Sequence, residues 1–151
     1  MRGFPRSANV RSVDKDEITF VRPAELTRNA PYAYAAVVDS HRMIFTAGAC
    51  PLDRDGRVVS EGDVIAQAAQ VMANLTATLS ASGASLSDVV KTTVYVASSR
   101  REELVSVWNV VRSAFGDHDA PSTLLGVSVL GYDGQLVEVE AVAAVRAADR
   151  E

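Results

Sequence analysis

The chain has 151 residues, of which 48% are hydrophobic and 23% are charged, and its formal net charge is −4. This length suits one domain around a single core, and the composition supports neither a disordered nor a fibrous protein. The acidic balance disfavours a nucleic-acid-binding protein, because such proteins need clustered Lys and Arg to neutralise phosphates.

The first residues and the cysteine content predict a cytoplasmic protein. Residues 1–16 include no apolar run of signal-peptide length, and we expect them to form a flexible leader before a single domain at 17–148. The longest apolar stretches are about ten residues, well short of the ~20 that a membrane span needs. Cys50 is the only cysteine, so an intramolecular disulfide is impossible and a reducing compartment is the simplest expectation.

Three short β-rich runs open the predicted domain. The first is 18–21, which ends before Pro23 because proline lacks the donor that a strand needs. Two apolar runs follow, Ala35–Val38 and Met43–Ala47, and residues 39–42 between them have the composition of a turn. We expect these two runs to pair as an antiparallel hairpin.

Two amphipathic helices are predicted further along the chain. Apolar residues recur at steps of three and four over 63–82, where Asp63 is a suitable N-cap and Gly83 a suitable left-handed residue after the end. A second apolar helical face covers 104–115, and Gly116 marks its stop.

Three more β-rich runs complete the pattern, at Val89–Ala97, Thr123–Leu130 and Leu136–Val145. The order β-β-β, helix, β, helix, β-β predicts an α+β fold with a mixed sheet and two helices on one of its faces. In the last strand, both alternating sets of residues include apolar side chains. A sheet face that is partly apolar but not covered by helices is typical of a subunit interface, so we expect a homo-oligomer.

Four segments of the chain carry motifs in a characteristic order. They are FTAGACP at 45–51, QAAQVMANLTATL at 67–79, GASLSDVVKTTVYV at 83–96 and VEVEAVA at 137–143. Together they resemble the RidA family, also called the YjgF/YER057c/UK114 family, over residues 18–146. The first motif departs from the family element fxSGQxP, because Ala47 and Ala49 stand in place of its Ser and Gln.

This resemblance implies both a fold and a reaction. The fold is chorismate-mutase-like and assembles into a homotrimeric barrel with a small-molecule pocket at each subunit interface. Active members hydrolyse 2-imino or enamine acids to 2-keto acids and ammonia. In that reaction an arginine grips the substrate carboxylate, while a protein carboxylate near the imine carbon positions or deprotonates water.

By motif position, the resemblance implies Glu138 as the catalytic carboxylate. It also implies Tyr34, Gly48 and Asn109 as substrate-binding residues, and we expect Ala49 beside Gly48 and the hydroxyl residues Ser122 and Thr123 to bind substrate as well. Structural roles are the alternative for several of them. Glu138 could simply be a glutamate on a solvated strand face, which is common, and Tyr34 could simply pack against the sheet. Ser122 and Thr123 could shape the turn at Pro121 and bind no ligand.

The arginine of the family is missing. Its PaRs loop aligns with residues 120–123 and places Ser122 where the arginine stands. A serine offers one neutral donor in place of a charged fork, which costs a substrate carboxylate about 1.5–3 kcal/mol of hydrogen bonding. Arginines of a neighbouring subunit are candidates to replace it, namely Arg42, Arg100 and Arg101.

The leading hypothesis is therefore a hydrolase of the imine or enamine deaminase type with altered specificity. The alternatives are a non-catalytic small-ligand-binding or regulatory trimer, and a tailoring enzyme for a specialised metabolite that uses the same pocket. Endoribonuclease activity is also associated with the family, but the acidic balance makes it the least favoured hypothesis.

No metal or cofactor is expected. His41 and His118 are isolated in the sequence, whereas zinc sites need three or four ligands at recognisable spacing. No phosphate loop or dinucleotide fingerprint is present. Cys50 follows a strand end, where a thiolate would be a nucleophile, but a lone cysteine is more often a small buried apolar residue.

Overall fold

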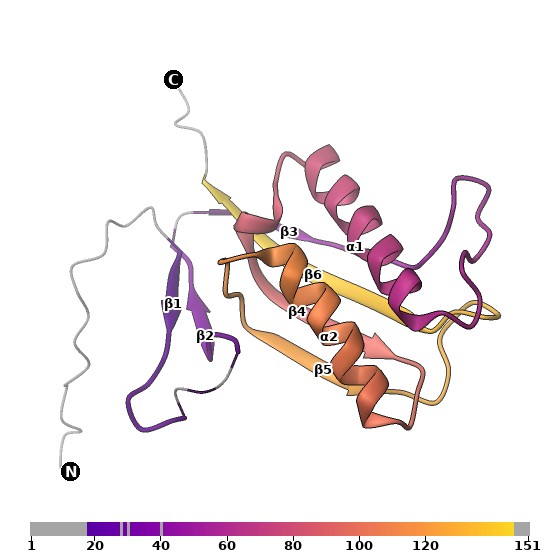
Figure 1. The fold of residues 1–151 in the computed structure, drawn as a ribbon. Helices are drawn as coiled ribbons and strands as arrows, with labels where there is room; N and C mark the ends of the chain where they lie inside the picture. The colour runs from indigo at the N-terminus through magenta and orange to yellow at the C-terminus, as the bar shows by residue number, and fades with distance from the viewer. Residues whose placement is uncertain (1–17, 28, 30, 40, 147–151) are drawn as a thin grey trace, which may run out of the picture.

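The computed structural model describes residues 18–27, 29, 31–39 and 41–146. In chain order, the elements are β1 (Thr19–Val21), β2 (Ala35–Val37), β3 (His41–Phe45), α1 (Val64–Ala81), the short 3₁₀ helix η1 (Leu86–Asp88), β4 (Val89–Val96), α2 (Arg101–Phe115), β5 (Ser122–Gly126) and β6 (Val137–Arg146) (Figure 1). The predicted order of helices and strands is confirmed. The predicted leader, 1–16, lies outside the described residues.

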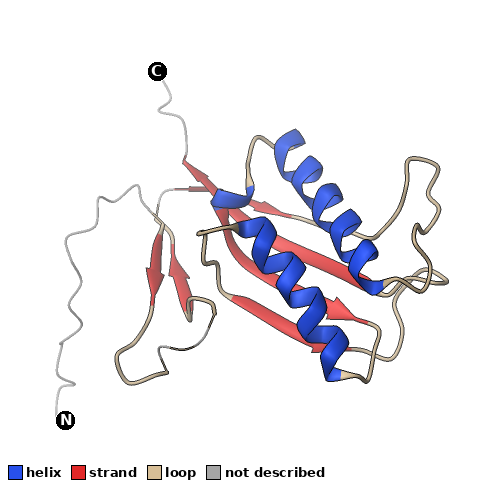
Figure 2. Ribbon diagram, viewed as in Figure 1, coloured by secondary structure: helices blue, strands red, loops and turns tan. Residues whose placement is uncertain are grey.

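The main sheet has four strands in the order β3-β6-β4-β5. β6 is antiparallel to both of its neighbours, while β4 and β5 are parallel. Parallel neighbours need a crossover connection, and α2 supplies it. Both helices lie on the same face of this sheet (Figure 2), which confirms the predicted α+β fold with a mixed sheet.

The predicted hairpin between the second and third strands is wrong. β2 pairs antiparallel with β1 in a separate two-stranded sheet, and β3 pairs antiparallel with β6. The turn composition at 39–42 favours a reversal between neighbouring segments, but His41 and Arg42 belong to β3 and pair with the end of β6. The long β6 offers β3 five register partners, which a local hairpin with the three-residue β2 would not match.

The fifth strand is shorter than the predicted 123–130. Its parallel partner β4 ends at Val96, which pairs with Gly126, so the residues beyond have no strand beside them. A Cβ at Gly126 would lie 2.8 Å from the carbonyl oxygen of Ser98, which shows how closely the two chain segments approach there.

Both ends of α1 lie where the sequence predicts them, at Asp63 and before Gly83. The side chain of Asp63 accepts hydrogen bonds from the backbone N–H groups of Ile65 and Ala66, as an N-cap does. At the other end Gly83 has φ +76°, and the N–H of Ala84 bonds to the carbonyl of Leu79 in a Schellman arrangement. None of the helices among the described residues is long and apolar enough to cross a membrane.

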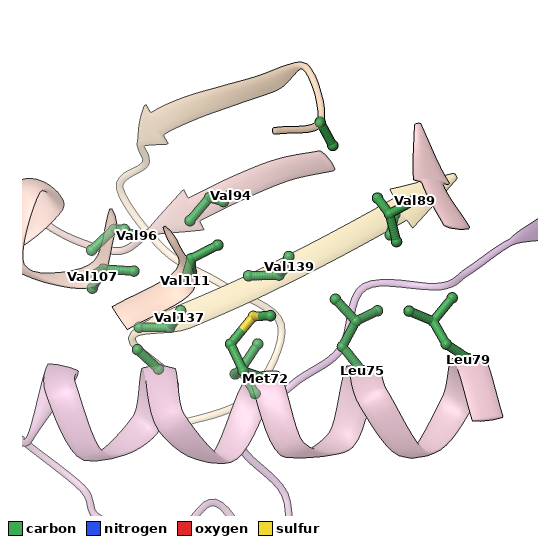
Figure 3. Packing of buried hydrophobic residues seen from close by; sticks show 14 of the residues in the cluster. Met72, Leu75, Leu79, Val89, Val94, Val96, Val107, Val111, Val137 and Val139 are labelled. Carbon is green, nitrogen blue, oxygen red and sulfur yellow. The ribbon is translucent and has the colours of Figure 1, made fainter. Parts of the chain in front are cut away.

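The core lies between the helices and the sheet. Figure 3 shows the apolar side chains of α1 directed at β6 and those of α2 directed at β4; the labelled residues are Met72, Leu75, Leu79, Val89, Val94, Val96, Val107, Val111, Val137 and Val139. Alternation along the strands leaves a second sheet face, here called the open face. Its side chains are Met43, Phe45, Lys91, Thr93, Tyr95, Thr123, Leu125, Glu138, Glu140 and Val142.

Candidate functional site

Glu138 lies on the open face of β6, with its half-buried side chain directly over Gly48. Ala49 forms a bridge with Val139 through two backbone hydrogen bonds of 2.8 and 3.2 Å, which holds the chain after β3 against β6. A Cβ placed on Gly48 would lie 1.9 Å from Glu138 Oε1. Only glycine therefore leaves room for this carboxylate.

Two side chains contact the same oxygen of Glu138. Gln135 donates from Nε2 to Glu138 Oε2 over 3.0 Å, and the thiol of Cys50 lies 3.5 Å from that oxygen. Burial and, after it, the charge and hydrogen bond of Glu138 raise the pKa of Cys50 to about 11. The thiol therefore stays protonated at neutral pH and acts as a donor to the carboxylate, which argues against a nucleophilic cysteine.

Asn74 of α1 fixes the loop that carries Cys50. Its amide nitrogen donates to the carbonyls of Cys50 and Leu52 over 2.8 and 2.9 Å, and its oxygen accepts from Gln70. A fully used amide of this kind holds the loop against the helix. Asn74 stands in the NLTATL part of the second motif, so this motif holds the loop of Cys50 in place beside Glu138.

Polar side chains continue across the open face beside Glu138. The hydroxyl of Tyr95 donates to Glu140 Oε1 over 3.1 Å, and this hydrogen bond is the main cause that raises the pKa of Tyr95. Lys91 donates to Thr123 Oγ1 over 2.7 Å, and burial lowers the pKa of this lysine. A cavity of about 170 Å³ lies here, lined by Phe45, Thr46, Lys91, Thr93, Glu140, Ala141 and Val142.

The register of β5 separates the two predicted hydroxyl residues. Ser122 pairs with Thr92 on the helix side of the sheet, where their hydroxyl oxygens lie 2.6 Å apart. Thr123 pairs with Thr93 and lies on the open face. The structure therefore brings Thr123, and not Ser122, to the same face as Glu138.

The structure does not bring Tyr34 or Asn109 to Glu138 within the chain. The hydroxyl of Tyr34 donates to the carbonyl of Thr27, and Asn109 is exposed on α2. A neighbouring ring, Tyr32, instead lines a depression with Trp108 and Thr123. Tyr32 follows Pro31 and lies two residues before Tyr34; the sequence analysis named Tyr34 alone, and the sequence carries no signal that separates the two tyrosines.

Sequence reasoning also missed Gln135. This residue is 4% exposed in the structure. The sequence did not single it out, because it stands among turn residues just before the last strand. The only available signal was an amide three residues before a predicted catalytic glutamate. Within the described part of the chain, no three His, Cys, Asp or Glu side chains gather in a way that would hold a metal ion.

The arrangement supplies one carboxylate with a fixed oxygen, a glycine beside it and a polar surface across the sheet. Such a carboxylate can orient a water molecule or accept a proton from it. General-base activation of a water molecule is therefore within the chemistry that Glu138 can supply.

Comparisons with known proteins identify the family. Residues 25–145 match the family model described as Endoribonuclease L-PSP. The 2-iminobutanoate/2-iminopropanoate deaminase of Salmonella typhimurium is 35% identical over 126 residues, which is 80% of this chain and 95% of that protein. Protein DfrA of Myxococcus xanthus is 46% identical over 66 residues, but this match spans only 44% of this chain and 50% of that protein.

A solved structure agrees with this assignment. The Rid family protein YyfB of Yersinia pestis, whose function is described as unknown, has a TM-score of 0.79 at 27% identity, with 85% of this chain and 98% of that chain covered. The predicted resemblance is therefore confirmed, and the chain belongs to the RidA (YjgF/YER057c/UK114) family, which the family model describes as Endoribonuclease L-PSP.

Proposed function

We propose that this protein is a small-molecule hydrolase of the imine or enamine deaminase type, in which Glu138 orients and deprotonates the attacking water. The observation that carries the proposal is the Glu138 carboxylate over Gly48, with Cys50 and Gln135 both on Oε2. Among the described residues, no hydrogen-bond donor contacts Oε1. The similarity to a 2-iminobutanoate/2-iminopropanoate deaminase supports this reaction class.

We propose further that the substrate specificity differs from that of the deaminases, because β5, the strand at the position of the family's PaRs loop, carries no arginine on the open face. Thr123 occupies the open face there, two strands away from Glu138 in the order β6-β4-β5. Two strand spacings, together with a register offset of two residues along the strands, put the two Cα atoms roughly 12 Å apart. A small substrate and a long arginine side chain would fill that gap together. A threonine hydroxyl reaches a much shorter distance and carries no charge.

A homotrimer is the assembly that we propose around this site. The open face carries large exposed apolar side chains, with Phe45 75%, Leu125 43% and Met43 38% exposed. Apolar side chains gathered on one sheet face favour burial against another copy. In such a trimer, Tyr34 and Asn109 would come to the Glu138 of a neighbouring subunit. A monomer mass by light scattering at micromolar concentration would contradict this assembly.

The decisive assay couples an amino-acid oxidase, which releases the imine, to trapping of the remaining imine with semicarbazide. We expect the wild type to lower the trapped imine and Glu138→Gln to abolish that effect, with general-base catalysis contributing about 10²–10⁴-fold. A wild type without effect on any imine offered, or an unchanged rate in Glu138→Gln, would refute the proposal.

Two matched arginine variants test the specificity. Thr123→Arg places the cation on the face of Glu138, whereas Ser122→Arg places it on the helix side beside the buried Thr92. We expect faster hydrolysis of carboxylate-bearing imines in Thr123→Arg and no gain in Ser122→Arg. Equal effects of the two variants would mean that the sheet face does not determine substrate binding.

A non-catalytic ligand-binding protein is the second candidate, favoured by the absence of the arginine at 122 and 123. It predicts no turnover in the wild type together with ligand binding that survives in Glu138→Gln. Calorimetry with a 2-keto acid, the product of the proposed reaction, separates this candidate from the enzyme.

A further inference from the structure

We propose that Gln135 is the positioning residue of the Glu138 site: its buried amide holds Oε2 of the carboxylate and leaves Oε1 for water or substrate. This inference rests on the proposed function for the role of Glu138, but not for the contact itself. The family motifs that identified Glu138 contain no such residue, and the Ser and Gln of the strand-end motif are Ala47 and Ala49 here.

The amide of Gln135 has a single orientation. Its oxygen accepts from the backbone N–H of Tyr132 over 3.1 Å, and its nitrogen donates to the carbonyl of Val137 over 3.1 Å and to Glu138 over 3.0 Å. A flipped amide would set its oxygen against two acceptors and its NH₂ group against a donor. The three contacts therefore fix which end faces the carboxylate.

The backbone around Gln135 is held independently. Gln67 of α1 is fully buried; it donates to the carbonyl of Gly134 over 2.9 Å and accepts from the N–H of Leu136 over 2.7 Å. These two bonds bracket Gln135 on both sides. A buried helix residue thus anchors the segment, and the segment presents its amide to Glu138.

If Gln135 only closed the turn before β6, its side-chain nitrogen would not need to contact Glu138. Closing the turn at 132–135 uses the backbone bond from Gln135 to Tyr132 and the side-chain oxygen of Gln135. The nitrogen of the same side chain takes no part in closing that turn, and it donates to the carbonyl of Val137 and to the carboxylate of Glu138. A hydrogen bond to a charged acceptor is stronger than a neutral one, so the contact restrains the half-buried Glu138.

The single cysteine provides a test that needs no activity. Because Glu138 beside the thiol suppresses its ionisation, Glu138→Gln should speed alkylation of Cys50 by iodoacetamide at pH 8 by about three- to tenfold. If Gln135 positions Glu138, the same change in a Gln135→Met background should alter the rate by less than about twofold. The same acceleration in both backgrounds would overturn the proposal.

Thermal melting checks that each variant folds. Where Gln135→Met melts early, Gln135→Asn replaces it in the cycle, because it keeps an amide that is one methylene too short to reach Glu138. In the imine assay, Gln135→Met should lower kcat by at least about tenfold with little change in KM. A wild type without imine hydrolysis would refute the proposed function, while the alkylation cycle would still decide whether Gln135 positions Glu138.

Discussion

Gly48→Ala is the change with the clearest structural consequence. The added Cβ would lie 1.9 Å from Oε1, 2.5 Å from Cδ and 2.7 Å from Cγ of Glu138, all below the 3.0 Å that real Cβ contacts respect. Gly48 does not have a positive φ, so its backbone conformation suits alanine. The steric clash with Glu138 is therefore the expected cause of any destabilisation by Gly48→Ala.

Glu138 relieves the clash by rotating away, and it then loses its contacts with Gln135 and Cys50. A hydrogen bond to a charged group is worth about 1.5–3 kcal/mol, and partial exposure of this carboxylate reduces the loss. We expect the free energy of unfolding to fall by about 1–2 kcal/mol in urea titrations. Turnover in the imine assay should fall by about 10²-fold or more, because the displaced carboxylate no longer meets the substrate.

A double-mutant cycle isolates the cause. Glu138→Ala removes all three clashing atoms, so Gly48→Ala should cost less than about 0.5 kcal/mol in that background. Gly131→Ala is the matched control, because Gly131 has no positive φ and no atom within 4 Å of an added Cβ. If Gly48→Ala were equally destabilising with and without the Glu138 side chain, the steric reasoning would be refuted.

Three further predictions test the supports of the fold and site. Asp63→Ala should lower the free energy of unfolding by about 1 kcal/mol, while Asp63→Asn retains most of the cap; equal losses in urea titrations would contradict the capping role. Asn74→Ala should cost about 1–3 kcal/mol and speed hydrogen exchange of the Ala49 amide, unlike Thr78→Ala on the exposed side of α1. The pKa of Cys50 is raised from 9.0 to about 11, so alkylation of this thiol at pH 8 should be roughly 100-fold slower in the folded chain than in the urea-unfolded chain. Because deprotonation of Cys50 then favours unfolding, the contribution of this thiol to stability is complete below about pH 9 and is lost as the pH rises through about 11. Equal alkylation rates in the folded and unfolded chain would contradict this environment.

The sequence predicted the site unevenly. Motif position led to Glu138 and Gly48, and the structure places them against each other. Ser122 and Thr123 were indistinguishable by sequence, because the face on which a strand residue lies depends on register with the neighbouring strand. Gln135 escaped because its importance arises from hydrogen bonds to groups that only the folded chain brings together.

The sequence by itself determined the order of helices and strands, the limits of α1 and the apolar pattern that buries one face of α1, α2, β4 and β6. These features depend on local properties such as apolar spacing, the Asp63 cap and the conformational freedom of Gly83. Tertiary structure decided which strands pair, as the pairing of β3 with β6 instead of β2 shows. Strand pairing depends on contacts between segments far apart in the chain, so the partners of Glu138 also became visible only in the folded protein.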